Sequence, residues 1–143
     1  MTIILLKRSL ILILIAFSFF SCEKKDENPG MLLTGRWNQV SIHIINYYDN
    51  VKTSETTNTY TVGEYVFEVY DNGTASRFHN GHLADSYYWS VEGNILTLTW
   101  DTGVDQKIEY SVDDNSLVFR WAVVESYDGH NTRSEYESVY IRD

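Results

Sequence analysis

Apolar and polar side chains alternate along most of the chain after residue 35. Leu96, Leu98 and Trp100, for example, alternate with Thr97 and Thr99. A period of two indicates strands that bury one face and expose the other to water. Because this region has no apolar stretch of helical period, the pattern predicts an all-β fold.

Clusters of Asp, Asn and Gly divide this region into runs rich in Tyr, Val, Ile, Thr, Phe and Trp. The residues in the runs favour strands, and the residues in the clusters favour turns. Asn72-Gly73 is expected to form a type I′ hairpin, since both central positions of that turn need positive φ. The polar stretch 46–58 is expected to be the only long connection. The eight expected strands span approximately 36–46, 58–70, 74–80, 83–91, 94–101, 106–112, 116–125 and 132–142.

The expected strands follow one another through short loops, which favours antiparallel neighbours. Such a sheet has two unpaired edges unless its first and last strands meet. An eight-stranded antiparallel up-and-down barrel removes both edges and is the predicted fold. A two-sheet Greek-key sandwich is the alternative, and it would need a long crossover of the kind that only 46–58 could provide.

The N-terminal segment has the order of a secretory signal peptide: basic, apolar, small, then charged. Lys7 and Arg8 precede eleven residues, 10–20, of which only Ser18 is polar. A membrane-spanning helix takes roughly 20 apolar residues, so a cleaved signal is favoured over an uncleaved span. The expected organisation is therefore a signal peptide at 1–21, a tether at 22–30 and a single domain at 31–143.

Ser21-Cys22 resembles the end of the signal motif of bacterial lipoproteins, although Phe19 and Phe20 depart from the Leu and small residue usual there. The resemblance implies that Cys22 carries a lipid, and that the protein is exported and anchored to the outer membrane, on the periplasmic or the cell-surface side. Lys25-Asp26-Glu27 resembles a surface-export signal. A solvated linker is the alternative interpretation of that run.

Composition restricts the classes of partner. The chain has one cysteine, so the fold must be stable without disulfides. Its formal net charge of −9 becomes −11 when residues 1–21 are removed, because Lys7 and Arg8 leave and no anion does. Nucleic acid and anionic lipid headgroups are therefore not expected as partners, on electrostatic grounds.

The domain also resembles lipocalins. The resemblance consists of Gly35-Arg36-Trp37 at the start of the first strand, and of the later pattern Tyr87-x-Trp89-x-Val91-x-Gly93-Asn94-x-Leu96-x-Leu98. It implies a barrel in which Trp37 closes one end and an arginine packs across it, with Arg142 the candidate by position and Arg120 the alternative. It also implies that a small apolar molecule is held inside.

An eight-stranded barrel is wide enough either to be filled by side chains or to hold one small ligand. The main prediction is a partly open interior that binds an apolar or amphipathic ligand. The alternative is a filled barrel that binds a partner at its surface, through Tyr47-Tyr48 or the loop 126–131. The residues expected to line a ligand site are Tyr65, Phe67, Trp89, Leu98, Trp100, Phe119 and Trp121.

Catalytic and metal chemistry is not expected, and no cofactor is implied. The sequence contains no Gly-x-Ser-x-Gly motif and no phosphate-binding glycine loop. His79 and His82 could share a metal only if the turn at Asn80-Gly81 brought them together. Asp113-Asp114-Asn115 is interpreted as a turn, with calcium binding as the alternative.

Overall fold

The computed structural model describes residues 29–143, so the predicted signal peptide, Cys22 and Lys25-Asp26-Glu27 lie outside the described residues. Within the described part of the chain, no helix has the length and apolarity needed to cross a bilayer. The elements in order are α2 (Pro29–Leu33), β1 (Gly35–Tyr48), β2 (Val51–Thr59), β3 (Tyr65–Val69), β4 (Thr74–His79), β5 (His82–Glu92), β6 (Ile95–Thr99), β7 (Asp105–Val112), β8 (Ser116–Tyr127) and β9 (His130–Arg142).

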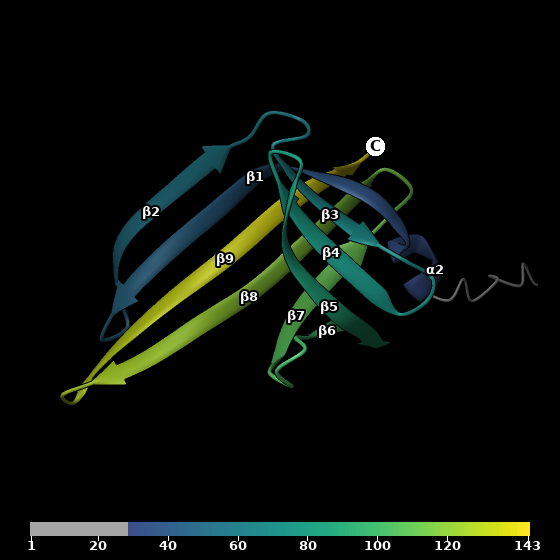
Figure 1. Ribbon diagram of the computed structural model, residues 1–143. Helices are drawn as coiled ribbons and strands as arrows, with labels where there is room; N and C mark the ends of the chain where they lie inside the picture. The colour runs from purple at the N-terminus through teal and green to yellow at the C-terminus, as the bar shows by residue number, and fades with distance from the viewer. Residues whose placement is uncertain (1–28) are drawn as a thin grey trace, which may run out of the picture.

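Eight of these strands form a closed antiparallel barrel, as predicted (Figure 1). The order around the barrel is β1-β3-β4-β5-β6-β7-β8-β9, and β9 returns to pair with β1. The start of β1 closes the ring because Trp37 pairs with Phe67 of β3 on one side and with Arg142 of β9 on the other. This part of the sheet therefore has no free edge.

The prediction of a loop at 46–58 and a strand at 58–70 was wrong. Residues 51–59 form β2, which pairs with the second half of β1 and lies outside the barrel. Every residue of β2 is exposed, so the segment shows no apolar alternation. Its five β-branched residues and its hydrogen bonds to β1 still favour an extended backbone. The barrel strand β3 begins only at Tyr65.

The turn between β3 and β4 also differs from the prediction, because Gly73 has positive φ and Asn72 does not. Oδ1 of Asn72 instead accepts hydrogen bonds from the backbone N–H and the hydroxyl of Thr74, at 3.0 and 2.7 Å. The backbone N–H of Tyr70 donates to the Thr74 carbonyl at 2.9 Å, so residues 71–73 form a three-residue loop, with glycine at the left-handed position. Two-residue turns with positive φ at both positions occur instead at Asp49-Asn50, Asn80-Gly81 and Asp128-Gly129.

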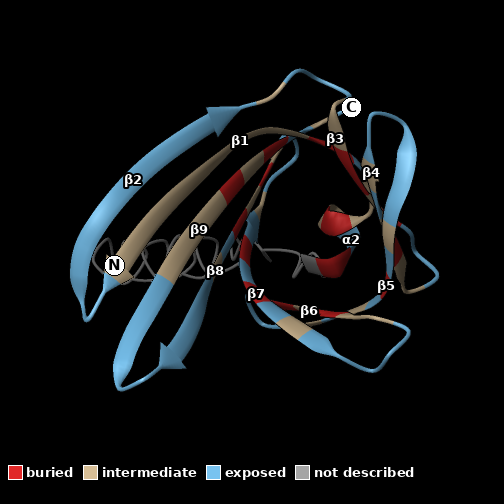
Figure 2. Cartoon of the chain, turned by 60° about the vertical axis from the view of Figure 1, so that its left-hand side comes forward, coloured by how far each residue is buried: buried red, intermediate tan, exposed pale blue. Residues whose placement is uncertain are grey.

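Aromatic and aliphatic side chains fill the middle of the barrel. Phe67, Phe119 and Tyr140 are 3%, 3% and 8% exposed, and the ring centroids of Phe67 and Phe119 lie 5.5 Å apart in an edge-to-face arrangement. Figure 2 looks into the ring of strands and shows α2 inside one end of it. Leu33 of α2 is fully buried there, so the helix closes this end of the barrel.

Trp37 and Arg142 hold α2 in place. The indole N–H of Trp37 donates to the carbonyl of Leu33 at 2.8 Å, and the Arg142 guanidinium lies 4.2 Å from the Trp37 ring centroid. The same guanidinium donates to the carbonyls of Leu32, Thr34 and Asp114 at 2.7, 3.1 and 2.8 Å. The prediction that Arg142 packs across Trp37 is confirmed, whereas Arg120 pairs with Glu137 on the outer surface.

Three barrel strands continue well beyond the ring. β1 pairs with β3 only as far as Asn38, and β8 pairs with β7 only as far as Arg120. Beyond these residues β1, β8 and β9 remain paired, and β2 adds to the other edge of β1. Residues 41–59 and 121–136 thus form a four-stranded sheet, β2-β1-β9-β8, which we call the sheet extension; in Figure 1 it reaches away from the barrel.

Candidate functional site

The structure distributes the predicted ligand-lining residues over three places. Phe67, Leu98 and Phe119 lie in the packed core, where they are 3–4% exposed. Trp89 lies toward the end closed by α2, and its indole N–H donates to the carbonyl of Tyr70 at 3.0 Å. The other three, Tyr65, Trp100 and Trp121, are half-buried toward the opposite end of the barrel. An internal ligand site formed by all of these residues stays a prediction.

The open end of the barrel is polar as well as aromatic. Arg77 forms an ion pair with Asp85, and the strand register places both side chains on the inward face. Burial raises the pKa of Tyr87 to about 12 and also raises that of Tyr140. Tyr65 stacks on His79 with centroids 4.4 Å apart. These contacts pair polar groups with one another at the entrance to the core.

A cavity of about 530 Å³ lies at the closed end, between α2 and the wall of the barrel. Trp89 and Val91 contribute its apolar lining from β5, and Met31 contributes from α2. Met31 is 74% exposed. The remaining lining residues are Gly30, Thr34 and Asp71.

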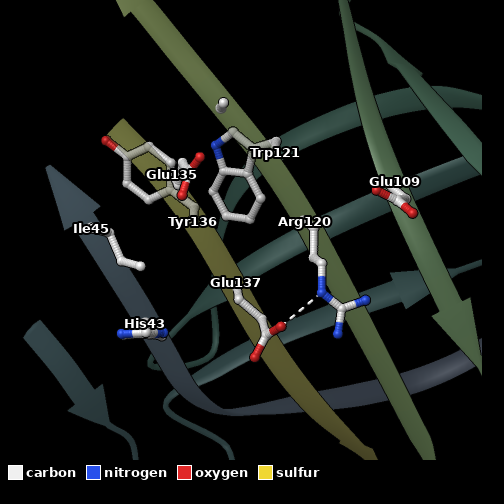
Figure 3. A pocket seen from close by; sticks show the side chains of 9 residues that line it. His43, Ile45, Glu109, Arg120, Trp121, Glu135, Tyr136 and Glu137 are labelled. Carbon is white, nitrogen blue, oxygen red and sulfur yellow. Dashed lines mark hydrogen bonds and ion pairs between the residues drawn. The ribbon is translucent and has the colours of Figure 1, made fainter. Parts of the chain in front are cut away.

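A second hollow lies on the outer side of the sheet, at the base of the sheet extension, and is shown in Figure 3. Because Phe119 and Ser138 face the core, their neighbours Arg120 and Glu137 face outward. We call this hollow the outer groove, and its volume is about 410 Å³. It is lined by His43, Ile45, Glu109, Arg120, Trp121, Ala122, Glu135, Tyr136 and Glu137. Of these, Trp121 and Tyr136 alternate with Arg120 and Glu137 and therefore project to the inner face of the sheet.

The strand register explains how the groove is assembled. His43, Glu137 and Arg120 are cross-strand partners in one row, and Ile45, Glu135 and Ala122 form the next row on the same face. Cross-strand partners have Cβ atoms only about 5 Å apart. Ile45 and Ala122 therefore flank Glu135, so an apolar side chain lies on each side of this carboxylate.

The groove carries more negative than positive charge, with three carboxylates and one guanidinium among its lining residues. Arg120 Nε donates to Glu137 Oε2 at 2.7 Å, which Figure 3 marks with a dashed line. Glu135 Oε2 accepts from the Tyr47 hydroxyl at 3.2 Å. Beside the groove, hydrogen bonds from Lys52 and His43 lower the pKa of Glu55. Glu55 is thus a carboxylate held ionised at the edge of the groove.

The surface alternatives predicted from sequence lie at the far part of the sheet extension. Tyr48 is 45% exposed and stacks on His130 at 5.2 Å, whereas Tyr47 lies under the Arg133 guanidinium. The segment 126–131 forms the ends of β8 and β9 and their turn, with Tyr127 87% exposed.

The groove residues His43, Ile45, Glu135 and Glu137 were not predicted as a site. They are far apart in sequence and meet only through the β1–β9 register. The available signal was strand length, since the strands predicted at 36–46 and 116–125 continue past the residues that pair with β3 and β7.

The possible metal ligands have other contacts. The β4–β5 hairpin does pair His79 with His82, but Nε2 of His79 lies 3.1 Å from Nδ2 of Asn80. The Asp113 carboxylate accepts the backbone N–H groups of Asn115 and Ser116, which lower its pKa. Among residues 29–143, no group of three or more His, Cys, Asp or Glu side chains is arranged to hold a metal ion.

Comparison with known proteins adds no relative. The chain matches no protein-family model, no curated protein and no solved structure.

Proposed function

We propose that this chain is a lipid-anchored protein of the cell envelope that binds a protein partner in the outer groove. The signal-like segment and Cys22 support the anchor. The observation that most supports a surface function is the packing of Phe67, Leu98 and Phe119, because side chains in mutual contact at 3–4% exposure leave little space for a ligand.

The chemistry of the groove defines the class of partner. Its carboxylates attract a Lys or Arg, and Ile45 and Ala122, on either side of Glu135, favour an apolar side chain next to that cation. The groove lies on the face of a single sheet layer, whereas a small-molecule site buries most of its ligand. A protein segment with a basic residue beside an apolar one fits this surface best.

The anchor is tested by Cys22→Ser. This variant should move from the membrane fraction to the soluble or unprocessed fraction, whereas the parent chain should partition with membranes. Unchanged partitioning of the variant would disprove lipid attachment at Cys22. A separate experiment tests which side of the outer membrane the domain lies on. If protease added to intact cells does not cleave the parent chain, the domain lies on the periplasmic side.

The binding site is tested with a photo-crosslinking residue at position 45 in intact cells. A discrete crosslinked product is expected, and it should weaken with added salt because the attraction is electrostatic. Glu109→Lys should reduce the product at least several-fold, whereas the matched charge reversal Glu92→Lys on β5 should not. Equal crosslinking from Ser90, on the wall of the barrel, would contradict a site at the groove.

The small-ligand function remains a second candidate, because Tyr65, Trp100 and Trp121 are only half-buried toward the open end. Burial of apolar ligand surface there would contribute roughly 25 cal/mol per Å², less the cost of immobilising the ligand. A saturable change in tryptophan emission with a fatty acid or aromatic probe would favour this candidate. No change across a broad panel of apolar probes would exclude it.

A further inference from the structure

Asparagine is followed by glycine twice in the chain, at Asn72-Gly73 before β4 and at Asn80-Gly81 between β4 and β5. Asparagine is one of the chemically less durable residues. When glycine follows it, the glycine backbone nitrogen can attack the carboxamide carbon, Cγ, because glycine has no Cβ to keep the two atoms apart. This attack needs a carboxamide that is free to turn and a glycine N–H that is not held in a hydrogen bond. The two pairs differ in both respects.

Both reacting groups of Asn72-Gly73 are held by hydrogen bonds. Oδ1 of Asn72 accepts from the backbone N–H and from the hydroxyl of Thr74, at 3.0 and 2.7 Å. The N–H of Gly73 donates to the carbonyl of Tyr70 at 3.3 Å. Attack of the Gly73 nitrogen on Cγ would break these hydrogen bonds, so the fold protects Asn72.

Asn80-Gly81 is much less restrained. Both residues are exposed, and the N–H of Gly81 donates no hydrogen bond to any residue of 29–143. Apart from the two chain neighbours of Gly81, no heavy atom lies within 4 Å of the position that a Cβ would occupy there, so water reaches this turn. Within the part of the chain that the structure describes, the Asn80 carboxamide makes one hydrogen bond, from Nδ2 to Nε2 of His79 at 3.1 Å. Oδ1 of Asn80 is not held.

We propose that Asn80 is a site of spontaneous modification, which deamidates in the folded protein while Asn72 is protected. The Gly81 nitrogen gives up its proton and forms a bond to Cγ of Asn80. The bond between Cγ and Nδ2 breaks, and Nδ2 leaves as ammonia, which carries that proton away. Water then opens the succinimide ring at either of its carbonyls and gives aspartate or isoaspartate. The reaction transfers no electrons and needs no reactant other than water.

The modification would alter the open end of the barrel. The β4–β5 hairpin pairs His79 with His82, and the His79 ring stacks on Tyr65 with centroids 4.4 Å apart. Both products place a new carboxylate beside the His79 imidazole. Isoaspartate also routes the main chain through its own Cβ, so the two-residue turn is lengthened and the strand pairing next to it is disturbed. This inference does not depend on the partner proposed for the outer groove.

Mass spectrometry of the full chain, aged in detergent at neutral pH, tests the site. Tryptic cleavage after Arg77 places Asn72 and Asn80 on separate peptides. The peptide that contains Asn80 should convert to the mass of the carboxyl form at least several-fold faster than the peptide that contains Asn72. In the chain aged in denaturant, the two peptides should convert at similar rates, because the hydrogen bonds at Asn72 are absent there.

Three results would overturn the proposal. One is a folded chain in which Asn72 converts as fast as Asn80 or faster. Another is a folded chain in which Asn80 does not convert. The third is a preference for Asn80 that is equally large in denaturant, since local sequence and not the fold would then cause it.

Thr74→Val tests the protection of Asn72. Valine keeps the branched shape and the backbone N–H of Thr74 but removes the hydroxyl that donates to Asn72. Conversion at Asn72 should therefore rise several-fold, as expected for the loss of one hydrogen bond, and conversion at Asn80 should not change. Thr99→Val, which removes a hydroxyl that donates to Asp105 from β6, is the matched control and should affect neither site. If Asn72 stays as slow in Thr74→Val as in the parent, its hydrogen bonds do not protect it and the proposal fails.

Discussion

Asp49 lies against His130 at the far end of the sheet extension, with Oδ2 of Asp49 2.7 Å from Nδ1 of His130. The backbone N–H of Asn131 donates to Oδ1 of Asp49 at 2.8 Å, and the N–H of Asp49 donates to the Asn131 carbonyl at 2.8 Å. Tyr48 stacks on the His130 ring. The β1–β2 turn and the β8–β9 turn are therefore joined, although they are 81 residues apart.

This contact should make the tip of the sheet extension sensitive to acid. The hydrogen bond from Asn131, with a smaller effect of His130, lowers the pKa of Asp49 below 3.8. A carboxyl whose folded pKa is lowered stabilises the folded form above its ordinary pKa, and this contribution is lost as pH falls through the folded value. Amide exchange at Asn131, relative to the intrinsic exchange rate at each pH, should therefore accelerate below about pH 4.

Asp49→Asn tests the assignment, because it removes the titrating group while preserving the shape of the side chain. The acid-dependent acceleration at Asn131 should disappear in this variant, and Asp128→Asn in the neighbouring turn should retain it. If the acceleration persists in Asp49→Asn, another group causes it.

The buried tyrosines predict loss of stability in alkali. Burial raises the pKa of Tyr87 from 10.0 to about 12 and raises that of Tyr140 as well. A group whose folded pKa is raised contributes stability below its unfolded pKa, and that stability is lost as pH rises through the folded value. Between about pH 10 and 12 the free energy of unfolding should fall by about 2–3 kcal/mol through Tyr87 alone.

Denaturant unfolding at a series of alkaline pH values measures this fall. Tyr87→Phe should flatten it, since the phenyl ring packs similarly but cannot ionise. Tyr127→Phe, at a position that is 87% exposed, is the control and should change nothing. A fall that is as steep in Tyr87→Phe as in the parent would contradict this source.

Arg142 should contribute substantially to stability through the helix that closes the barrel. Arg142→Met removes its hydrogen bonds to three carbonyls and its contact with Trp37, which should cost about 2–4 kcal/mol. Arg133→Met, which removes an exposed guanidinium that pairs with Glu135, should cost less than about 1 kcal/mol. Chemical denaturation of both variants provides the comparison, and similar costs would argue against a special role for Arg142.

The interior should respond to added volume as a filled core does. Phe67→Trp enlarges a side chain that already contacts the rings of Phe119, Tyr87 and Tyr140. Overpacking of this kind costs about 1–3 kcal/mol. A free energy of unfolding that stays within about 0.5 kcal/mol of the parent would reveal unoccupied space inside and would revive the internal-ligand candidate.

The alternation of residues such as Leu96, Leu98 and Trp100 predicted strands with one buried face, because every second side chain of an extended chain points to the same face. Repeated turn residues predicted antiparallel neighbours, and the need to remove sheet edges predicted the closed barrel. The resemblance to lipocalins predicted that Arg142 packs over Trp37. The structure has this contact, and the Arg142 guanidinium also donates hydrogen bonds to three backbone carbonyls. These features depend on local pattern or on general rules of sheet closure.

The position of β2 and the sheet extension was decided by the tertiary structure. Residues 51–59 bury neither face of their strand. The strand forms because β1 extends beyond the barrel and supplies hydrogen-bond partners. The sequence of residues 51–59 alone does not indicate that these partners are present. The outer groove likewise brings His43, Glu137 and Arg120 together through the register of β1, β9 and β8. The register between strands that are distant in sequence is set by closure of the whole sheet. Alternation therefore predicted which side chains lie on the same face of a strand, but it did not predict which side chains of different strands contact each other.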